Sequence, residues 1–268
     1  MSSASTPRIR RSGRRSPLAS AALLLIGLLA TGGAYAAITA TSSAADASSQ
    51  ARVDALADEG EKLFAANCAS CHGLQAEGTE DAPTLIGVGA AAVDFQVGTG
   101  RMPMAAQGPQ APIKPVQFTD EQILALATWV ASLGPGPAIP EEEYLHGDDL
   151  PTGAELFRIN CAMCHNVAGA GGALTEGKFA PSLMGVEAKH IYEAMITGPQ
   201  NMPVFNDMNI TPEDKANIIS YLKYVEESGS PGGLDLGNLG PVSEGLFVWI
   251  FALGAIVGIT VWLTAKSN

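Results

Sequence analysis

The four cysteines of the chain form one short pattern twice, and its residue types and spacing suit a specific chemistry. The pattern is C-x-x-C-H, made once by Cys68, Cys71 and His72 and again by Cys161, Cys164 and His165. Two thiols three positions apart can each bond one vinyl group of the same porphyrin, and the adjacent imidazole then lies beneath the iron. The pattern predicts two covalently bound haem c groups, with the cysteines as attachment points and the two histidines as iron ligands.

Other uses of paired cysteines fit these motifs less well. A structural zinc site usually has its second cysteine pair within a few tens of residues. Here the pairs are 93 residues apart, and each is followed by histidine. A thioredoxin-like redox pair needs a βαβ setting, whereas the surrounding sequence shows helical patterns. A disulfide across a two-residue gap would close a strained loop. Covalent haem attachment accounts for both motifs.

The sixth iron ligand is predicted to be a methionine in each half of the chain. Met102 and Met202 both stand directly before proline and after a glycine-containing turn. A thioether is a suitable soft donor to iron, and His/Met ligation raises the reduction potential. Proline fixes φ and removes an amide donor, which favours an extended loop across the haem face. Met104 competes with Met102 because the segment GRMPM contains both, and the internal repeat favours Met102.

The other histidines and methionines have simpler interpretations. His190 lies in an expected helix from Val186 to Ile196, where a solvated position is favoured over competition for the second haem. His146, in an acidic connector, is expected to be solvated. Pro83 and Pro181 each offer a backbone carbonyl that could orient the proximal histidine, and a plain turn explains them equally well. The remaining methionines are expected to fill the core or lie on the surface: Met163, Met184, Met195 and Met208.

Both motifs belong to an internal repeat. Residues 60–72 and 153–165 are identical at eight of thirteen positions. An Ala-Pro-x-Leu stretch, a Met-Pro dipeptide and a helical pattern opened by Thr119 or Thr211 then follow in the same order. Apolar residues in the two helical patterns recur at i, i+3, i+4 and i+7. We therefore expect a mainly α protein in which one small module occurs twice, and covalent haem would supply the core that so small a module lacks.

The two ends of the chain are hydrophobic. Five arginines before Ala36 precede an uncharged stretch over residues 18–40, which fits both an export signal cleaved near Ala36 and a retained membrane anchor. Residues 245–265 are uncharged over about 20 positions, the length that spans a bilayer, with Trp249 and Trp262 toward the two ends. The positive-inside rule puts the C-terminus in the cytoplasm and the residues between the two runs outside.

Charge narrows the class of protein further. The chain has 268 residues and a formal charge of −12, but the segment before Ala36 has five arginines and no acid. The remainder has ten Lys and Arg against 27 Asp and Glu, a formal charge of −17. So acidic a body argues against a nucleic-acid partner, whose phosphates would repel it. With only 16% charged residues, the composition also excludes a coiled coil.

The ordered motifs resemble a known family. Two modules with C-x-x-C-H, Pro-x-Leu, Met-Pro and a closing helix look like tandem class I cytochrome c domains over about residues 52–228. Together with the segment PGGLDLGNLGPVSEGLFVWIF and the terminal apolar run, the chain resembles the diheme cytochrome cc subunit of the actinobacterial-type cytochrome bcc complex, a menaquinol:cytochrome c reductase. The residues that match the family pattern are Cys68, Cys71, His72, Met102, Cys161, Cys164, His165 and Met202.

The resemblance implies a role in respiration. The first module would take electrons from the Rieske iron–sulfur centre, and the second would pass them to the copper centre of a terminal cytochrome oxidase. The implied partners are a cytochrome b subunit, a Rieske protein, that oxidase and the membrane. The chain would be enzymatic only as the electron-transfer subunit of a translocase, without a catalytic acid, base or nucleophile, because the redox chemistry belongs to the cofactor.

The expected organisation follows from these patterns. A Pro-rich stretch within the first module, residues 107–117, is expected to be an ordered loop lying against that module. The segments in chain order are a basic cytoplasmic flank (1–17), a signal peptide or anchor (18–40), cytochrome c domain 1 (52–134), an extended acidic linker (135–151), cytochrome c domain 2 (152–228), a Gly-rich tether (229–243) and a transmembrane helix (244–265).

Two other functions remain open at this level. A membrane-anchored diheme peroxidase would need an easily vacated iron site, whereas both modules contain a Met-Pro loop. The diheme subunit of a cbb-type oxidase is usually anchored at its N-terminus, whereas the clearer apolar run here is C-terminal.

Overall fold

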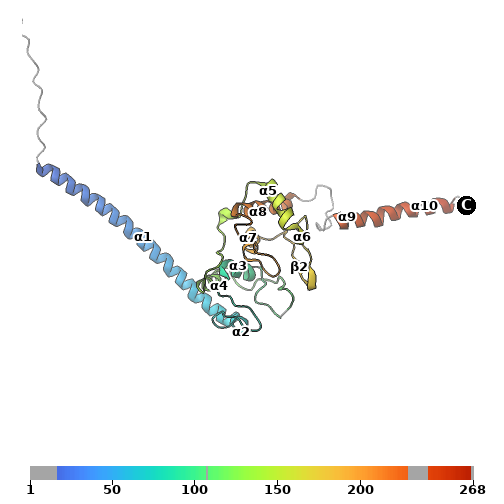
Figure 1. The fold of residues 1–268 in the computed structure, drawn as a ribbon, viewed down its shortest axis with the longest axis horizontal. Coiled ribbons are helices and arrows are strands. Elements are labelled where there is room, and N and C mark those ends of the chain that lie inside the picture. The colour runs from blue at the N-terminus through green and yellow to red at the C-terminus, as the bar shows by residue number, and fades with distance from the viewer. Residues whose placement is uncertain (1–16, 107, 229–240, 267–268) are drawn as a thin grey trace, which may run out of the picture. The chain divides into compact units, whose positions relative to one another are not determined.

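The computed structural model of the chain describes residues 17–106, 108–228 and 241–266. Most of the expected basic flank and Gly-rich tether therefore lies outside the described residues. As predicted, the protein is mainly helical, and the described residues include one small antiparallel sheet (Figure 1). The elements in chain order are α1 (Pro17–Asn67), α2 (Ala69–His72), α3 (Gly89–Gly98), α4 (Asp120–Ser132), η1 (Glu142–Tyr144), α5 (Leu150–Asn160), α6 (Ala162–His165), β1 (Gly172–Ala173), η2 (Thr175–Gly177), β2 (Phe179–Ala180), α7 (Ala188–Thr197), α8 (Pro212–Ser228), α9 (Pro241–Val248), η4 (Trp249–Leu253) and α10 (Gly254–Lys266).

The chain divides between Asp54 and Ala55 into two units. The first unit holds the apolar part of α1, which includes the stretch expected to be a signal or anchor. The second unit holds the end of α1 and all later elements, and it contains both C-x-x-C-H motifs. One continuous helix thus carries the apolar segment and then the first helix of the first module.

Two helical segments are long and apolar enough to cross a membrane. They are α1 and the segment Gly245–Lys266, whose most apolar windows have mean hydropathies of 2.0 and 2.4. The structure buries neither window against other parts of the chain. The C-terminal segment comprises most of α9, the π-helical turn η4 and α10. Both segments agree in length and composition with the two apolar runs in the sequence.

A helix pair forms the core of the first module. Gly60 of α1 lies so close to α4 that an added Cβ would be 2.1 Å from the carbonyl oxygen of Ala125. Glycine at this position lets the two backbones approach. One turn later the rings of Phe64 and Trp129 lie 4.5 Å apart between centroids, and both side chains are buried.

The second module repeats this packing with α5 and α8. An added Cβ at Gly153 would be 2.1 Å from the carbonyl oxygen of Asn217. Phe157 is fully buried and its ring lies 5.7 Å from that of Tyr221. Gly60 and Gly153, like Phe64 and Phe157, are identical positions of the sequence repeat. The repeat in sequence is therefore also a repeat of one helix contact.

The Gly153→Ala variant tests this contact. We expect it to lower the free energy of unfolding of the second module by about 1–3 kcal/mol, because an extra carbon in a close-packed contact forces the helices apart. Thermal unfolding followed by circular dichroism measures the loss. Gly108→Ala is the matched control, because an added Cβ there meets only an ordinary contact at 3.8 Å. Equal stability of the two variants would contradict the close helix contact.

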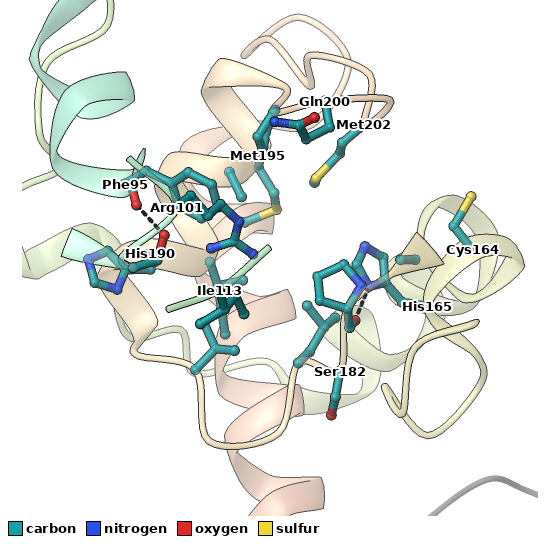
Figure 2. A pocket seen from close by; sticks show the side chains of 18 of the residues that line it. Phe95, Arg101, Ile113, Cys164, His165, Ser182, His190, Met195, Gln200 and Met202 are labelled. Carbon is teal, nitrogen blue, oxygen red and sulfur yellow. Dashed lines mark hydrogen bonds between the residues drawn. The ribbon is translucent and has the colours of Figure 1, made fainter. Parts of the chain in front are cut away.

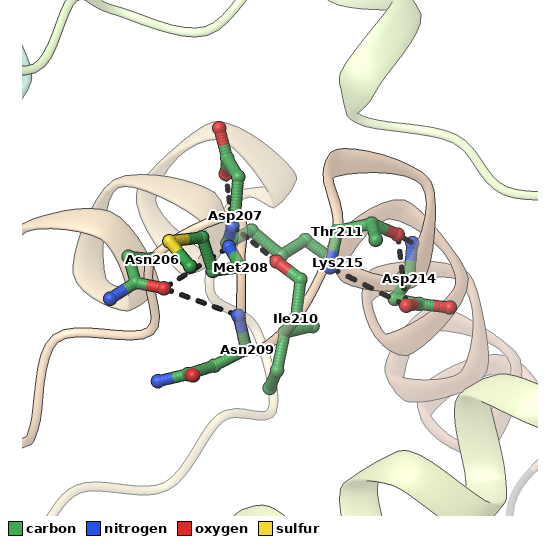
Figure 3. A network of polar contacts seen from close by, with 8 residues as sticks. All are labelled: Asn206, Asp207, Met208, Asn209, Ile210, Thr211, Asp214 and Lys215. Carbon is green, nitrogen blue, oxygen red and sulfur yellow. Dashed lines mark hydrogen bonds and ion pairs between the residues drawn. The ribbon is translucent and has the colours of Figure 1, made fainter.

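Both closing helices begin at the threonines expected to cap them. Thr119 forms a capping box with Gln122, whose backbone N–H donates to the Thr119 hydroxyl at 3.3 Å and whose side chain accepts from the Thr119 N–H at 3.0 Å. In the second module the Asp214 N–H donates to the Thr211 hydroxyl at 3.2 Å (Figure 3). Such side chains satisfy the free N–H groups of a first helical turn.

The connector between the modules packs against both of them. Its first part has no helix and lies along the first module, where the Ala91 N–H donates to the Pro137 carbonyl at 3.1 Å. Its second part joins the second module, because Leu145 is buried in that core. Helix α5 already begins at Leu150, where the Asp149 carboxylate accepts from the Thr152 N–H at 3.0 Å and caps the first turn.

The Pro-rich stretch is not confined to the first module. Ala111 is buried, and the Lys114 carbonyl lies so close to Gly100 that no Cβ would fit there. The Gln110 side chain, however, accepts from the Phe179 N–H and donates to the Phe179 carbonyl of β2, each at 2.9 Å. The loop lies against the first module as expected, and its Gln110 side chain also completes a strand edge of the second.

Candidate functional site

Each C-x-x-C-H motif folds into one short helical turn. In the first, the Cys71 and His72 N–H groups both donate to the Cys68 carbonyl, at 3.1 and 3.0 Å. In the second, the Cys164 and His165 N–H groups donate in the same way to the Cys161 carbonyl. The turn follows directly on the long helix of each module. The local chain therefore holds two thiols and one imidazole together, as attachment to one porphyrin requires.

A backbone carbonyl orients each proximal histidine. His72 Nδ1 lies 2.9 Å from the Pro83 carbonyl oxygen, and His165 Nδ1 lies 3.0 Å from that of Pro181. Because a carbonyl only accepts, Nδ1 carries the proton in both and the lone pair is on Nε2, the atom left for a metal. Of the two interpretations of these prolines, orientation of the histidine is the one that the geometry supports. Burial also lowers the pKa of His165, which favours the neutral ligand form.

Burial raises the pKa of the first thiol of each motif. Burial, together with the charge of Cys71, raises the pKa of Cys68 to about 11. Burial, together with the charge of Cys164, raises the pKa of Cys161 to about 11. Structural zinc sites use thiolates, which need a lowered pKa.

The second module has a large apolar cavity in front of its motif. Its volume is about 450 Å³, within the range of cofactor sites. The motif side chains, Pro181 and Met202 line it, and Figure 2 shows Met202 and His165 on different segments of the chain around it. The residues present thus fit a haem c whose iron would be bound by His165 and Met202.

The first module also lines this cavity. Phe95, Arg101 and Ile113 reach it from α3 and the loops that follow (Figure 2). Arg101 is 6% exposed and its guanidinium lies 4.7 Å from the centroid of the Phe95 ring. Among the described residues no carboxylate lies within ion-pair distance of Arg101. Sequence reasoning missed this residue, although a charge directly before Met102 where the repeat has Asn201 was a signal.

The two methionines predicted as ligands occupy equivalent places. Met102 packs on the first apolar core, as Cys68 and Ala69 do, and Met202 packs on the second core, as Cys161 does. Met104, the alternative, is not part of the first core among the residues that the structure describes. The packing favours Met102 in the first module, as the repeat does.

A buried lysine holds the loop that follows Met202. Lys215 of α8 is fully buried, and its ammonium donates to the Asp207 carboxylate at 2.6 Å and to the Ile210 carbonyl at 2.7 Å (Figure 3). The Asn206 side chain accepts from the Met208 and Asn209 N–H groups, both at 3.1 Å. These bonds tie the end of the methionine loop to the closing helix.

The remaining histidines and methionines lie partly as expected. His146 is exposed and pairs with Glu142 at 3.1 Å, and Met163 and Met208 are on the surface. Met195 is buried in the second core. The expectation for His190 is wrong, because this residue is 8% exposed and faces the first module. Its helix, α7, packs against α3, and this contact cannot be read from the sequence of α7.

Models of protein families match both modules. The model described as "Cytochrome c" matches residues 57–134, and the model described as "Cytochrome C oxidase, cbb3-type, subunit III" matches residues 148–222. The chain therefore contains two cytochrome c domains, the predicted fold class, and such domains carry covalently bound haem c. The second of these models covers the second module only.

Relatives match nearly the whole chain. The cytochrome bc1 complex cytochrome c subunit of Corynebacterium efficiens is 42% identical over 99% of this chain and 95% of the relative. That of Mycobacterium tuberculosis is 44% identical over 97% and 95%, and that of Corynebacterium diphtheriae is 40% identical over the full length of both. The chain belongs to the family of cytochrome c subunits of the cytochrome bc1 complex.

Proposed function

We propose that the chain is the membrane-anchored diheme cytochrome of a quinol:cytochrome c reductase, a translocase. It would relay electrons from the Rieske centre of that complex to a terminal cytochrome oxidase. The observation that carries the proposal is the duplicated site, in which each module holds a C-x-x-C-H turn, a carbonyl-oriented histidine and a packed methionine. When bound, haem c supplies each module with a one-electron iron couple.

The residues proposed to hold the two haems follow the repeat. Cys68 and Cys71 would attach the first haem, with His72 and Met102 as iron ligands. Cys161 and Cys164 would attach the second, with His165 and Met202 as ligands. The lining of the second cavity is mostly apolar, and the hydrophobic surroundings of a haem help to set its reduction potential.

The proposed modules, residues 52–134 and 152–228, share the second cavity. Arg101 would place a buried positive charge beside the haem of the second module, although it belongs to the first. Such a positive charge would attract the carboxylates of the haem and would stabilise the iron after it accepts an electron. Because residues of both modules line this cavity, the first module contacts the second haem site. Electron transfer between the two haems would need such contact between the modules.

The Arg101→Gln variant tests the role of this charge. Loss of the positive charge should destabilise the ferrous iron of one haem. We therefore expect the reduction potential of that haem to fall by tens of millivolts, where ~59 mV corresponds to a tenfold change in the equilibrium constant for one-electron reduction. Redox titration followed at the haem absorption bands measures the shift. Arg158→Gln is the matched control, because Arg158 is exposed on α5. Unchanged potentials in R101Q would contradict the role assigned to Arg101.

The proposed topology uses the two apolar ends. The segment Gly245–Lys266 would cross the membrane and leave the C-terminus in the cytoplasm, with both haem modules on the other side. Residues 18–40 would be a signal peptide or a second anchor. The acidic modules would then lie outside, and the arginine-rich flank inside.

Purification from native membranes in mild detergent tests the proposed function. We expect the chain to co-purify with a cytochrome b and a Rieske iron–sulfur protein, and with an oxidase under the gentlest conditions. A chain that purifies without these partners would contradict the assignment. Carbon monoxide binding by the native reduced protein would favour a peroxidase instead, because that chemistry needs a vacant iron position.

A further inference from the structure

Three ionisable side chains meet at the contact between α3 and α7, and one of them, His190, also lines the cavity of the second module. Asp94 comes from the first module, and His190 and Glu193 come from the second. They are 5%, 8% and 0% exposed. Because Asp94 and His190 are far apart in sequence, the packing of one module on the other creates this group.

The group is not satisfied by hydrogen bonds. His190 Nε2 and both carboxylate oxygens of Glu193 are buried without a hydrogen-bond partner among the described residues. His190 Nε2 lies 3.7 Å from Asp94 Oδ2 and 4.0 Å from Glu193 Oε2, beyond hydrogen-bond range. Buried polar atoms left unpaired are costly, so a further positively charged species is expected there.

The charges lead to the same conclusion. Lys189, whose ammonium lies 2.7 Å from Asp94 Oδ2, balances one of the two carboxylates. The other carboxyl group, that of Glu193, lies within ion-pair distance of His190 alone among the described residues. Burial, with the nearby charge of Asp94, raises the pKa of Glu193 to about 10, so a proton is the species that competes with a metal ion.

The donor set and its spacing suit a divalent metal. One ligand atom from each of the three residues lies within 4.8 Å of the others. His190 and Glu193 are three positions apart and share a helix face. Zinc is the common metal for this ligand set, and its bonds of about 2.0–2.2 Å to nitrogen and oxygen would require the three side chains to move closer together by rotation when the ion binds. Gly98 faces His190 Nε2, where an added Cβ would lie at 3.0 Å, so glycine leaves room at the donor atom.

We propose that Asp94, His190 and Glu193 bind one zinc ion that links the two modules. Lys189, whose side chain is 35% exposed, would turn toward solvent when the ion binds. The ion would fix α3 against α7, next to the cavity that both modules line. This site is separate from the proposed haem ligands and does not depend on them.

Metal analysis of the full-length haem-loaded chain, purified in detergent without chelators and after incubation with zinc chloride and desalting, tests the proposal. We expect one zinc per two covalent haems in the wild type and loss of at least nine-tenths of it in H190Q and E193Q. H146Q is the matched control, because His146 forms an exposed pair with Glu142 and should keep the zinc. The haem content and the visible spectrum of each variant show whether the chain still folds and binds haem, independently of its zinc content.

X-ray absorption at the zinc edge gives a test on the wild type alone. We expect a shell of nitrogen and oxygen ligands without sulfur. Absence of zinc from the wild type before and after zinc incubation would overturn the proposal and leave a proton as the neutralising species. Sulfur ligation, or full zinc retention in H190Q, would overturn it as well.

Discussion

Replacing both Cys161 and Cys164 by alanine is expected to lower covalent haem c from two per chain to one. The thioether bonds of the second site cannot form without these thiols. The loss should also destabilise the second module, because no covalently bound haem would occupy its cavity of about 450 Å³. A module this small has only a small hydrophobic core apart from the haem. Pyridine haemochrome spectra against protein concentration measure the ratio.

The equivalent change in the first module is the matched comparison. Replacing Cys68 and Cys71 should also leave one haem, with the spectrum of the second site. The two single-haem variants then show which absorption and potential belong to which module. A ratio of one in the unchanged chain would contradict two haems, and an unchanged ratio in the variants would contradict these attachment points.

The Met202→Ala variant is expected to remove the sulfur–iron bond of the second haem. The weak absorption near the red edge of the ferric spectrum should fall by about half, because only the first module would retain a thioether ligand. The potential of the second haem should fall on the order of 0.1 V, since the axial ligand is a main determinant of haem potential. Absorption spectra and redox titration measure both effects.

Met208→Ala is the control for this experiment. Met208 lies in the same loop but is 95% exposed, so its loss should change neither the absorption nor the potential. An unchanged spectrum in M202A would show that another residue binds the iron. Because Lys215 holds the end of this loop, the rest of the site should keep its place in M202A.

Much of the fold follows from local sequence. The capping threonines Thr119 and Thr211 and the apolar periodicity after them predict α4 and α8, because helix starts depend on side chains within one turn. The N-cap of α5, Asp149, lies in an acidic run that looks like linker charge, and its capping role depends on the backbone. The apolar ends are equally local, because length and composition decide whether a helix can span a membrane.

The candidate sites could also be predicted from local sequence only in part. Attachment chemistry needs only the five consecutive residues of each motif, so sequence predicts the thiols and proximal histidines. The carbonyl that orients each histidine lies 11 or 16 positions further on. Spacing alone left that role undecided.

By itself, the sequence determined the duplicated module, the apolar ends and the acidic body between them, and it predicted the attachment residues. Each of these depends on residues close together in the chain or on composition. Only the tertiary structure decided that Arg101 faces the second cavity, that Gln110 pairs with Phe179 and that His190 meets Asp94 in a buried group. These contacts join different modules, and their free energy depends on how two packed surfaces fit together, which no local pattern specifies.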